Sequence, residues 1–203
     1  MRIRLARITV SWVLIGVGVP LLLRAELGVA PFDVFNTGIA DALGGSFGTW
    51  YVVNSLVFYA IGTMLGTRPG PASIVGTFAI GPLINLFLDI VPTTELIVAR
   101  IGLLTGGIAI LAVGICMIIT TELGAGPSEV VMLGLVDRGL DLVPARWLAD
   151  GVPLLVGALL GGAFGVGTVV FTLVMAPLVK VGLRWLHYEP SATRTAALAL
   201  VAE

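Results

Sequence analysis

Charged residues are scarce in this sequence of 203 residues. Asp, Glu, Lys and Arg make up 11% of it, whereas soluble domains contain about 25%. Apolar residues make up 58%, and the mean hydropathy is +1.09. A soluble chain of this size could neither bury so much apolar surface nor cover itself with so few charges. The composition therefore excludes a soluble protein and indicates an integral membrane protein.

Cysteine and histidine are almost absent, with one residue of each, Cys116 and His187. One cysteine cannot form a disulfide within its own chain, so a secreted disulfide scaffold is excluded, and the two residues cannot build a metal-ligand cluster. A net charge of −1 without a basic face argues against a nucleic-acid partner. Phosphate-binding loops and nucleophile elbows are missing too, so we expect no enzyme, no cofactor and no metal site.

Apolar runs are abundant, and six of them are long enough to cross a bilayer as helices of about 20 residues or slightly fewer. The strict alternation of β-barrel strands is absent. We therefore expect an all-α membrane protein. Its six expected transmembrane helices cover about 8–23, 48–65, 72–90, 101–120, 145–160 and 165–181.

Two further segments, about 30–43 and 126–142, fit a full crossing poorly. Each begins with a stretch rich in Gly and Pro, and each contains carboxylates. A carboxylate at the centre of a transmembrane helix costs about 2.5–3.5 kcal/mol on insertion scales. We expect short re-entrant or interfacial helices that pack against the six spans. The alternative, in which both segments cross the bilayer, gives eight spans.

The chain also matches itself. Residues 26–33, Glu-Leu-Gly-Val-Ala-Pro-Phe-Asp, align with residues 122–129, Glu-Leu-Gly-Ala-Gly-Pro-Ser-Glu, at an offset of 96 (122 against 26), and later segments align at 95. Each copy, 1–94 and 95–188, contains three spans and one short helix, and 189–203 is expected to form a cytoplasmic tail. Because three is odd, the second copy enters from the opposite side, which predicts an inverted repeat. Spanning short helices would instead make the repeats parallel.

The repeated motif Leu-Gly-x-Ala/Gly-Pro-x-Asp/Glu is followed by a Gly-rich span and a helix with Gly/Ala-Pro. In these features the chain resembles the YczE-like family of bacterial integral membrane proteins and, more distantly, the YitT type. The resemblance extends over about residues 8–187. The first copy departs mildly from the motif, with Ala30 where the second has Gly126. The family implies a multi-span protein of the bacterial inner membrane and implies no particular biochemical activity.

Lys and Arg are distributed unevenly around the expected spans. In the six-span arrangement with the N-terminus inside, all basic residues except Arg24 and Arg100 fall on the cytoplasmic side. This bias predicts that both termini are cytoplasmic. The eight-span alternative exchanges Arg68 and Arg100 and gives about the same bias, so charge does not decide the number of spans.

Asp33 and Glu129 occupy equivalent positions, each two residues after a proline that suits the first position of a helix. In one interpretation they are helix starters stabilised by the helix dipole. In the other they form a carboxylate pair near a midplane cavity, where they bind a cation or share a proton. Asn36, Thr37 and Asp41 extend the helix face of Asp33, and this polar stripe lines a pathway or faces interfacial water.

Small and hydroxyl residues recur every four positions in two matching spans, and we expect them mainly to permit close helix packing. Prolines would bend the same spans, and a bend beside a cavity could act as a hinge. These packing or hinge candidates are Ser73, Thr77, Gly81 and Pro82 in the first copy and Thr168, Thr172 and Pro177 in the second.

The expected function is that of a transporter, or a permease component, for a small cationic or proton-coupled solute. The alternative is a non-transporting membrane protein that assembles or stabilises a partner membrane protein. A polar cavity near the midplane would favour the first function, and a solid core with a large flat apolar face would favour the second. The lipid bilayer is the expected surrounding, and the sequence permits a homo-oligomer without predicting one.

Overall fold

The computed structural model describes residues 2–121, 123–140 and 142–187, which form eight α-helices and no strand. The expected all-α class is confirmed. The helices are α1 (Arg2–Ala25), α2 (Pro31–Leu43), α3 (Phe47–Met64), α4 (Pro71–Ile90), α5 (Ile97–Ile119), α6 (Pro127–Val136), α7 (Leu142–Leu159) and α8 (Val166–Trp185).

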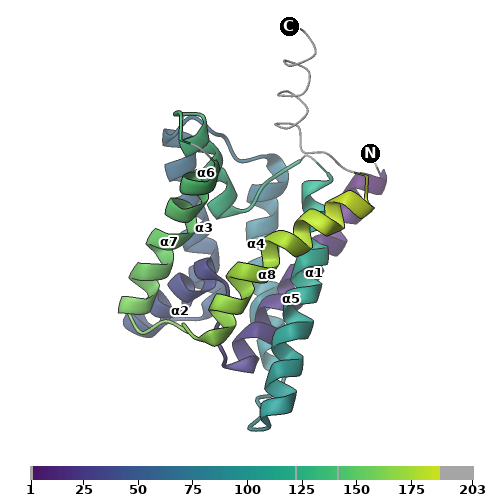
Figure 1. Ribbon diagram of the computed structural model, residues 1–203, viewed down its shortest axis with the longest axis vertical. Helices are drawn as coiled ribbons and strands as arrows, with labels where there is room; N and C mark the ends of the chain where they lie inside the picture. Colours follow the sequence, from purple (N-terminus) through teal and green to yellow (C-terminus); the bar gives the residue numbers. More distant parts are fainter. Residues whose placement is uncertain (1, 122, 141, 188–203) are drawn as a thin grey trace, which may run out of the picture.

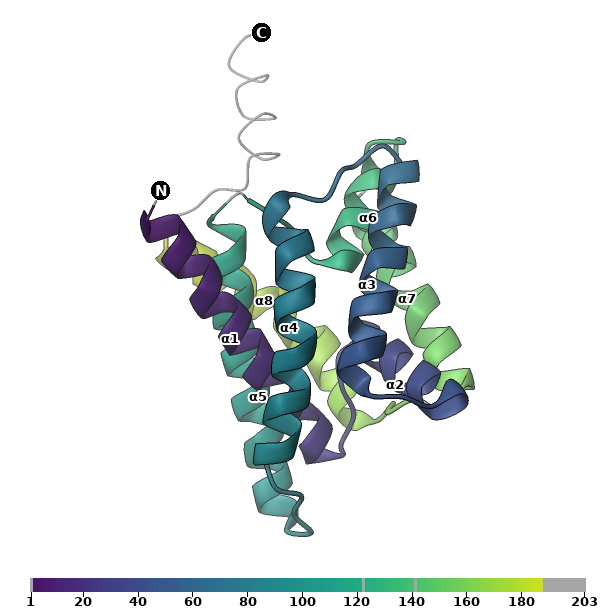
Figure 2. The same cartoon turned by 180° about the vertical axis from the view of Figure 1, so that it is seen from behind.

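Most of the helices run along the longest axis of the molecule (Figure 1, Figure 2). We call the end where α1 begins and α8 ends the upper end. Helices α1, α4 and α7 run from the upper to the lower end, and α3, α5 and α8 run back. Helix α1 packs on α4 and α5, and α5 packs on α8; α2 and α6 each pack on both α3 and α7, and α3 also packs on α4.

Four helices, α1, α4, α5 and α8, are long and apolar enough to cross a membrane. Helices α3 and α7 have 18 residues each, about 27 Å at the α-helical rise, and lie alongside the other four. Both contain buried or half-buried polar side chains, Asn54 and Ser55 in α3 and Arg146 and Asp150 in α7. Four of the six expected spans are therefore recovered from length and apolarity alone.

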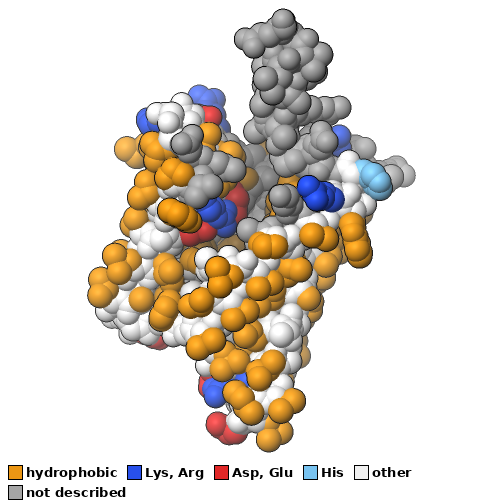
Figure 3. Space-filling model, in the orientation of Figure 1, with side chains coloured by type: hydrophobic (Ala, Val, Ile, Leu, Met, Phe, Trp, Pro, Cys, Tyr) orange, Lys and Arg blue, Asp and Glu red, His pale blue; other side chains and the backbone are white. Residues whose placement is uncertain are grey.

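Large apolar side chains cover much of the outer surface (Figure 3). Phe78 on α4, Leu155 on α7 and Leu173 on α8 are each more than half exposed. Such a surface is unfavourable in water and suits contact with lipid. Inside, α1 and α5 approach closely through small residues, with Gly18 against Gly107 and Gly114 against the backbone of Ser11.

Both short helices begin within one residue of the predicted start, and α6 ends earlier than predicted. Helix α2 covers 31–43, close to the expected 30–43. Helix α6 covers 127–136 and ends six residues before the expected 142. The reason is a turn after Val136, in which Gly139 has a φ of +94° that favours glycine and breaks the helix.

Candidate functional site

The chain that follows α1 turns back into the protein before α2 begins. Its carbonyl at Leu27 accepts a hydrogen bond from the amide of Gly167 at the start of α8, and Val29 N donates to Ala163 O at 3.2 Å. Gly28 has a φ of +112°, and a Cβ there would lie 2.7 Å from the backbone nitrogen and hydroxyl of Thr168. Only glycine fits this contact, which fixes the inward path of the chain.

A matching contact follows α5. Ala72 N, at the start of α4, donates to Leu123 O at 3.1 Å, and a Cβ on Gly124 would lie 2.7 Å from the nitrogen and hydroxyl of Ser73. The Ser73 hydroxyl donates to Ala125 O at 2.7 Å and accepts from Ala125 N at 2.8 Å. Ser73, expected to serve helix packing, therefore also holds the chain that leads into α6.

Each short helix then packs closely on a span of the other half of the chain. The backbones of α2 and α7 meet at Gly38 and Gly157, where a Cβ on Gly157 would lie 2.5 Å from backbone atoms of Phe35. Helices α6 and α3 meet at Gly134 and Gly62. Two short helices that begin at a proline are thus enclosed by α3 and α7.

Asp33 lies in the first turn of α2 and is only 4% exposed. Its Oδ1 lies 3.5 Å from Nδ2 of Asn36, and Oδ1 of Asn36 accepts a hydrogen bond from Nδ2 of Asn54 on α3 at 2.7 Å. Both amides are buried. Among the described residues, no basic side chain forms an ion pair with Asp33, and its one side-chain partner is the Asn36 amide.

Glu129 occupies the same position in α6, in different surroundings. Its side chain is 34% exposed and accepts a hydrogen bond from Nη1 of Arg146 at 3.0 Å. Nε of Arg146 also pairs with Asp150 one turn along α7. One arginine therefore joins two carboxylates. Figure 3 shows acidic and basic side chains exposed together on the face beside α7.

Two tyrosines of α3 contact α2 and the chain that leads into α6. Tyr51 is buried, and its ring packs edge-on against that of Phe32 in α2, with the ring centroids 5.9 Å apart. The hydroxyl of Tyr59 accepts a hydrogen bond from the Thr77 hydroxyl at 3.3 Å. It lies 3.4 Å from the carbonyl oxygen of Ser73 and 3.5 Å from that of Ala125. Sequence reasoning missed both tyrosines and the role of Arg146. A signal existed, because Tyr51 and Arg146 align at the offset of 95.

The polar stripe of α2 divides into two parts. Asp33 and Asn36 are sealed inside, whereas Asp41 is exposed and Thr37 is half-buried. The Thr37 hydroxyl accepts a hydrogen bond from Ala163 N at 2.8 Å. Thr37 and Asp41 both line an open cavity of about 330 Å³, whose other walls include Leu23 and Leu88. This cavity reaches to one helical turn from Asp33.

The packing or hinge candidates also differ between the two halves. On α4, Thr77 is buried and Gly81 packs on Gly48 of α3. On α8, Thr168 is buried, but Thr172 is exposed and donates only to the carbonyl of Thr168. The remaining candidates, Pro82 and Pro177, are exposed positions inside α4 and α8. Over the described ranges, no three His, Cys, Asp or Glu side chains gather into a metal-ligand set.

Long apolar helices and an apolar outer surface define the class: this is a helical, multi-pass membrane protein. The chain belongs to a family of unknown function, DUF6198, which matches it over residues 2–184. The resemblance to YczE expected from the repeated motif is confirmed. The chain is 24% identical to the uncharacterized membrane protein YczE of Bacillus subtilis, over 92% of this chain and 89% of the relative.

Two further relatives are similar over most of their length. An uncharacterized protein of Haemophilus influenzae is 26% identical, over 82% of this chain and 77% of its own. The uncharacterized protein YyaS of Bacillus subtilis is 25% identical, over 76% of this chain and 80% of its own. No solved structure matches the chain.

Proposed function

We propose that the protein transports a small cationic or proton-coupled solute across the bacterial inner membrane, and that it is not an enzyme. The burial of Asp33 carries this proposal. An ionisable side chain inside a membrane protein is costly and marks substrate or ion pathways. Asp33 is 4% exposed and, in the described part of the chain, has only an amide as its side-chain partner.

The proposed architecture consists of two inverted copies, 1–94 and 95–188, each with three spans and one re-entrant helix. Paired contacts support it. Leu27 bonds to Gly167 as Leu123 bonds to Ala72, and α2 packs on α7 as α6 packs on α3. The spans of the first copy, α1, α3 and α4, also run opposite to α5, α7 and α8 (Figure 1). Transporters with inverted repeats place their sites between the halves.

The proposed pathway passes through the space between α2, α3, α6 and α7. From the lower end, the cavity lined by Thr37 and Asp41 leads towards Asp33. From the other side, the half-exposed Glu129 and Arg146 are accessible beside α7. Helix α3 packs along α4, whereas α7 and α8 make few contacts with each other. A rocking motion that brought α7 and α8 together and separated α3 from α4 would expose the site to the opposite side of the membrane.

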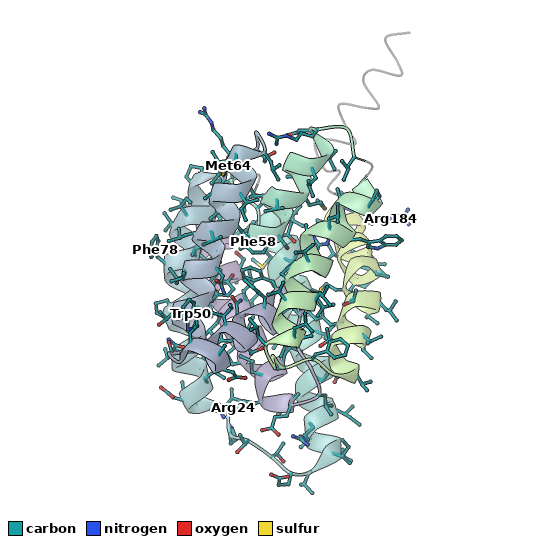
Figure 4. The ribbon with its side chains drawn as sticks, turned by 90° about the vertical axis from the view of Figure 1, so that its left-hand side faces the viewer. Arg24, Trp50, Phe58, Met64, Phe78 and Arg184 are labelled. Carbon is teal, nitrogen blue, oxygen red and sulfur yellow. The ribbon has the colours of Figure 1, made fainter. Side chains whose placement is uncertain are left out.

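The proposed orientation puts both chain ends in the cytoplasm. Arg184 and Met64, whose carbonyl accepts a hydrogen bond from Arg138, lie at the upper end (Figure 4). At the lower end, Arg24 bonds to a backbone carbonyl and Arg100 pairs with Glu26. Among the described residues, exposed basic side chains are more numerous at the upper end, which favours the cytoplasmic side.

Cysteine labelling of intact cells tests the orientation. A cysteine replacing Arg7 or Arg184 should resist an impermeant thiol reagent, whereas one replacing the exposed Leu96 should react. Arg68→Cys should also resist in the six-span arrangement and react in the eight-span one. Labelling of Arg7→Cys or Arg184→Cys from outside would contradict the proposed orientation.

Flux measurements test the transport function. Purified protein in vesicles that contain a pH-sensitive dye is given a membrane potential, first with protons alone and then with a panel of small amines and alkali cations. We expect flux that Asp33→Asn abolishes and that the exposed Asp89→Asn leaves unchanged. Retained flux in Asp33→Asn, or no flux in the wild type under any condition, would reject the proposal; the second result would favour the non-transporting alternative.

A further inference from the structure

We propose that, among the described residues, Asp33 is the carboxylate that binds a proton, and that Glu129 is an ion-pair partner of Arg146 and not a second proton site. This inference rests on the proposed transport function and specifies its coupling ion. It also assigns different roles to Asp33 and Glu129, although the repeated sequence aligns them. It is argued from the partners of each group.

The neighbours of Asp33 leave its negative charge without compensation. Helix α2 packs on α3 and α7. From α3, Tyr51 packs against Phe32 next to Asp33 and Asn54 bonds to Asn36, and neither α3 side chain is charged. Helix α7 contacts α2 at Gly157, and of its two charged residues Arg146 pairs with both Glu129 and Asp150. A carboxyl group in such surroundings is stabilised in its neutral form by burial.

The direction of the hydrogen bonds favours a proton over a metal cation. A hard cation requires a shell of oxygen ligands. Asn36 presents its NH2 group to Asp33, and its oxygen is already occupied by the NH2 group of Asn54. Turning the Asn36 amide around would place two donors together at Asn54. The Asn36 amide therefore offers an N–H group to one carboxylate oxygen of Asp33 and leaves the second oxygen to hold a proton.

Glu129 forms an ion pair with Arg146. The guanidinium donates Nη1 to Glu129 at 3.0 Å, while its Nε pairs with Asp150. Protonation of Glu129 would break a charge-assisted hydrogen bond and leave the arginine with one partner fewer. The aligned residue beside Asp33 is Tyr51, which carries no such charge.

Infrared difference spectroscopy of the full-length protein in lipid vesicles tests the inference without any transport. On acidification, the wild type should show one carbonyl stretch of a protonated carboxylic acid in an apolar environment. Asp33→Asn should lose this band, Asp33→Glu should shift it, and Glu129→Gln should keep it. Replacing choline with sodium ions in the buffer should leave the band unchanged.

Three results would overturn the inference: a band that persists in Asp33→Asn, a band that disappears in Glu129→Gln, or a band that sodium suppresses. If Asp33→Asn fails to fold, the shift in Asp33→Glu decides the assignment. The outcome is separable from the transport proposal. A titrating Asp33 without flux would reject transport and leave the proton site standing, whereas flux without the band would reject the proton site alone.

Discussion

Helices α2 and α6 begin alike, with a proline in the first position and a carboxylate in the third. The first carboxylate, Asp33, is sealed among amides, and the second, Glu129, pairs with Arg146 at the edge of the protein. Their aligned neighbours in the following helices are Tyr51 and Arg146. Local sequence thus decides where each helix begins, and one residue on a neighbouring helix decides whether its carboxylate has a counter-ion.

The contacts of the two short helices also differ in tightness. A Cβ on Gly157 would meet backbone atoms of α2 at 2.5 Å, and these cannot move without shifting the helix. A Cβ on Gly62 would first meet the end of the Val130 side chain on α6, which can rotate. Helix α2, which carries the carboxylate without an ion pair, is therefore also held more rigidly than α6.

The largest effect is expected at this tight contact. Gly157→Ala should lower the free energy of unfolding by about 3 kcal/mol, the upper part of the range for overpacking, and Gly62→Ala by about 1 kcal/mol. Thermal unfolding in detergent measures both. Gly151→Ala on α7 is the matched control, because its Cβ would face open space and alanine favours the helix. Equal losses at Gly157 and Gly62 would remove the difference in rigidity.

Removing the arginine should have the next largest effect. Arg146→Gln leaves Glu129 and Asp150 without a counter-ion. The cost should be about 2 kcal/mol, less than the about 3–5 kcal/mol of a broken buried pair, because the arginine side chain is 43% exposed. In a background with Glu129→Gln and Asp150→Asn, the same substitution should cost much less. A double-mutant cycle that finds no coupling would contradict the pairing.

A smaller effect is expected where the chain enters α6. Ser73→Ala should cost about 1 kcal/mol, because Ala125 loses hydrogen bonds of both its N–H and its carbonyl. Thr168→Ala should cost less, because the hydroxyl of Thr168 accepts one hydrogen bond, from Gly165 N at 3.3 Å. Unfolding midpoints of the two variants give the comparison. A larger loss in Thr168→Ala would reverse the proposed order of the two connections.

The smallest effect on stability should come from Asp33. At neutral pH, Asp33→Asn should change the free energy of unfolding by less than about 0.5 kcal/mol, because it removes no ion pair and an amide replaces a carboxyl group of equal size. Glu129→Gln should destabilise the protein through loss of its bond to Arg146. The two variants are measured together in one unfolding series. Strong destabilisation in Asp33→Asn would indicate a counter-ion for this group.

The sequence predicted the features that depend on neighbouring residues. Pro31 and Pro127 mark the starts of the short helices, and the apolar runs mark α1, α4, α5 and α8. It did not predict the bond of Asn36 to Asn54, because that contact depends on how α2 is rotated against α3. The ion pair of Glu129 with Arg146 depends in the same way on the packing of α6 against α7.

The sequence pattern also failed to predict where α6 ends. Apolar residues return at Leu140 and Leu142, so the predicted helix was extended to 142, whereas the turn at Gly139 ends it. The exposure of Thr172 on α8 was missed for a different reason. Its spacing is identical to that of Thr77, and only the separation of α7 from α8 leaves it facing outward.

The docking of the Leu27 carbonyl on Gly167 has a consequence for synthesis of the protein. The two residues are separated by 140 positions (167 against 27), so the loop that steers α2 inward is made long before its support. At about 5–20 residues per second, the ribosome takes roughly 7–28 s to cover that distance. Helix α7, on which α2 rests, also emerges late. During this interval the nascent chain carries α2 and its carboxylates without the contacts that α7 and α8 later provide.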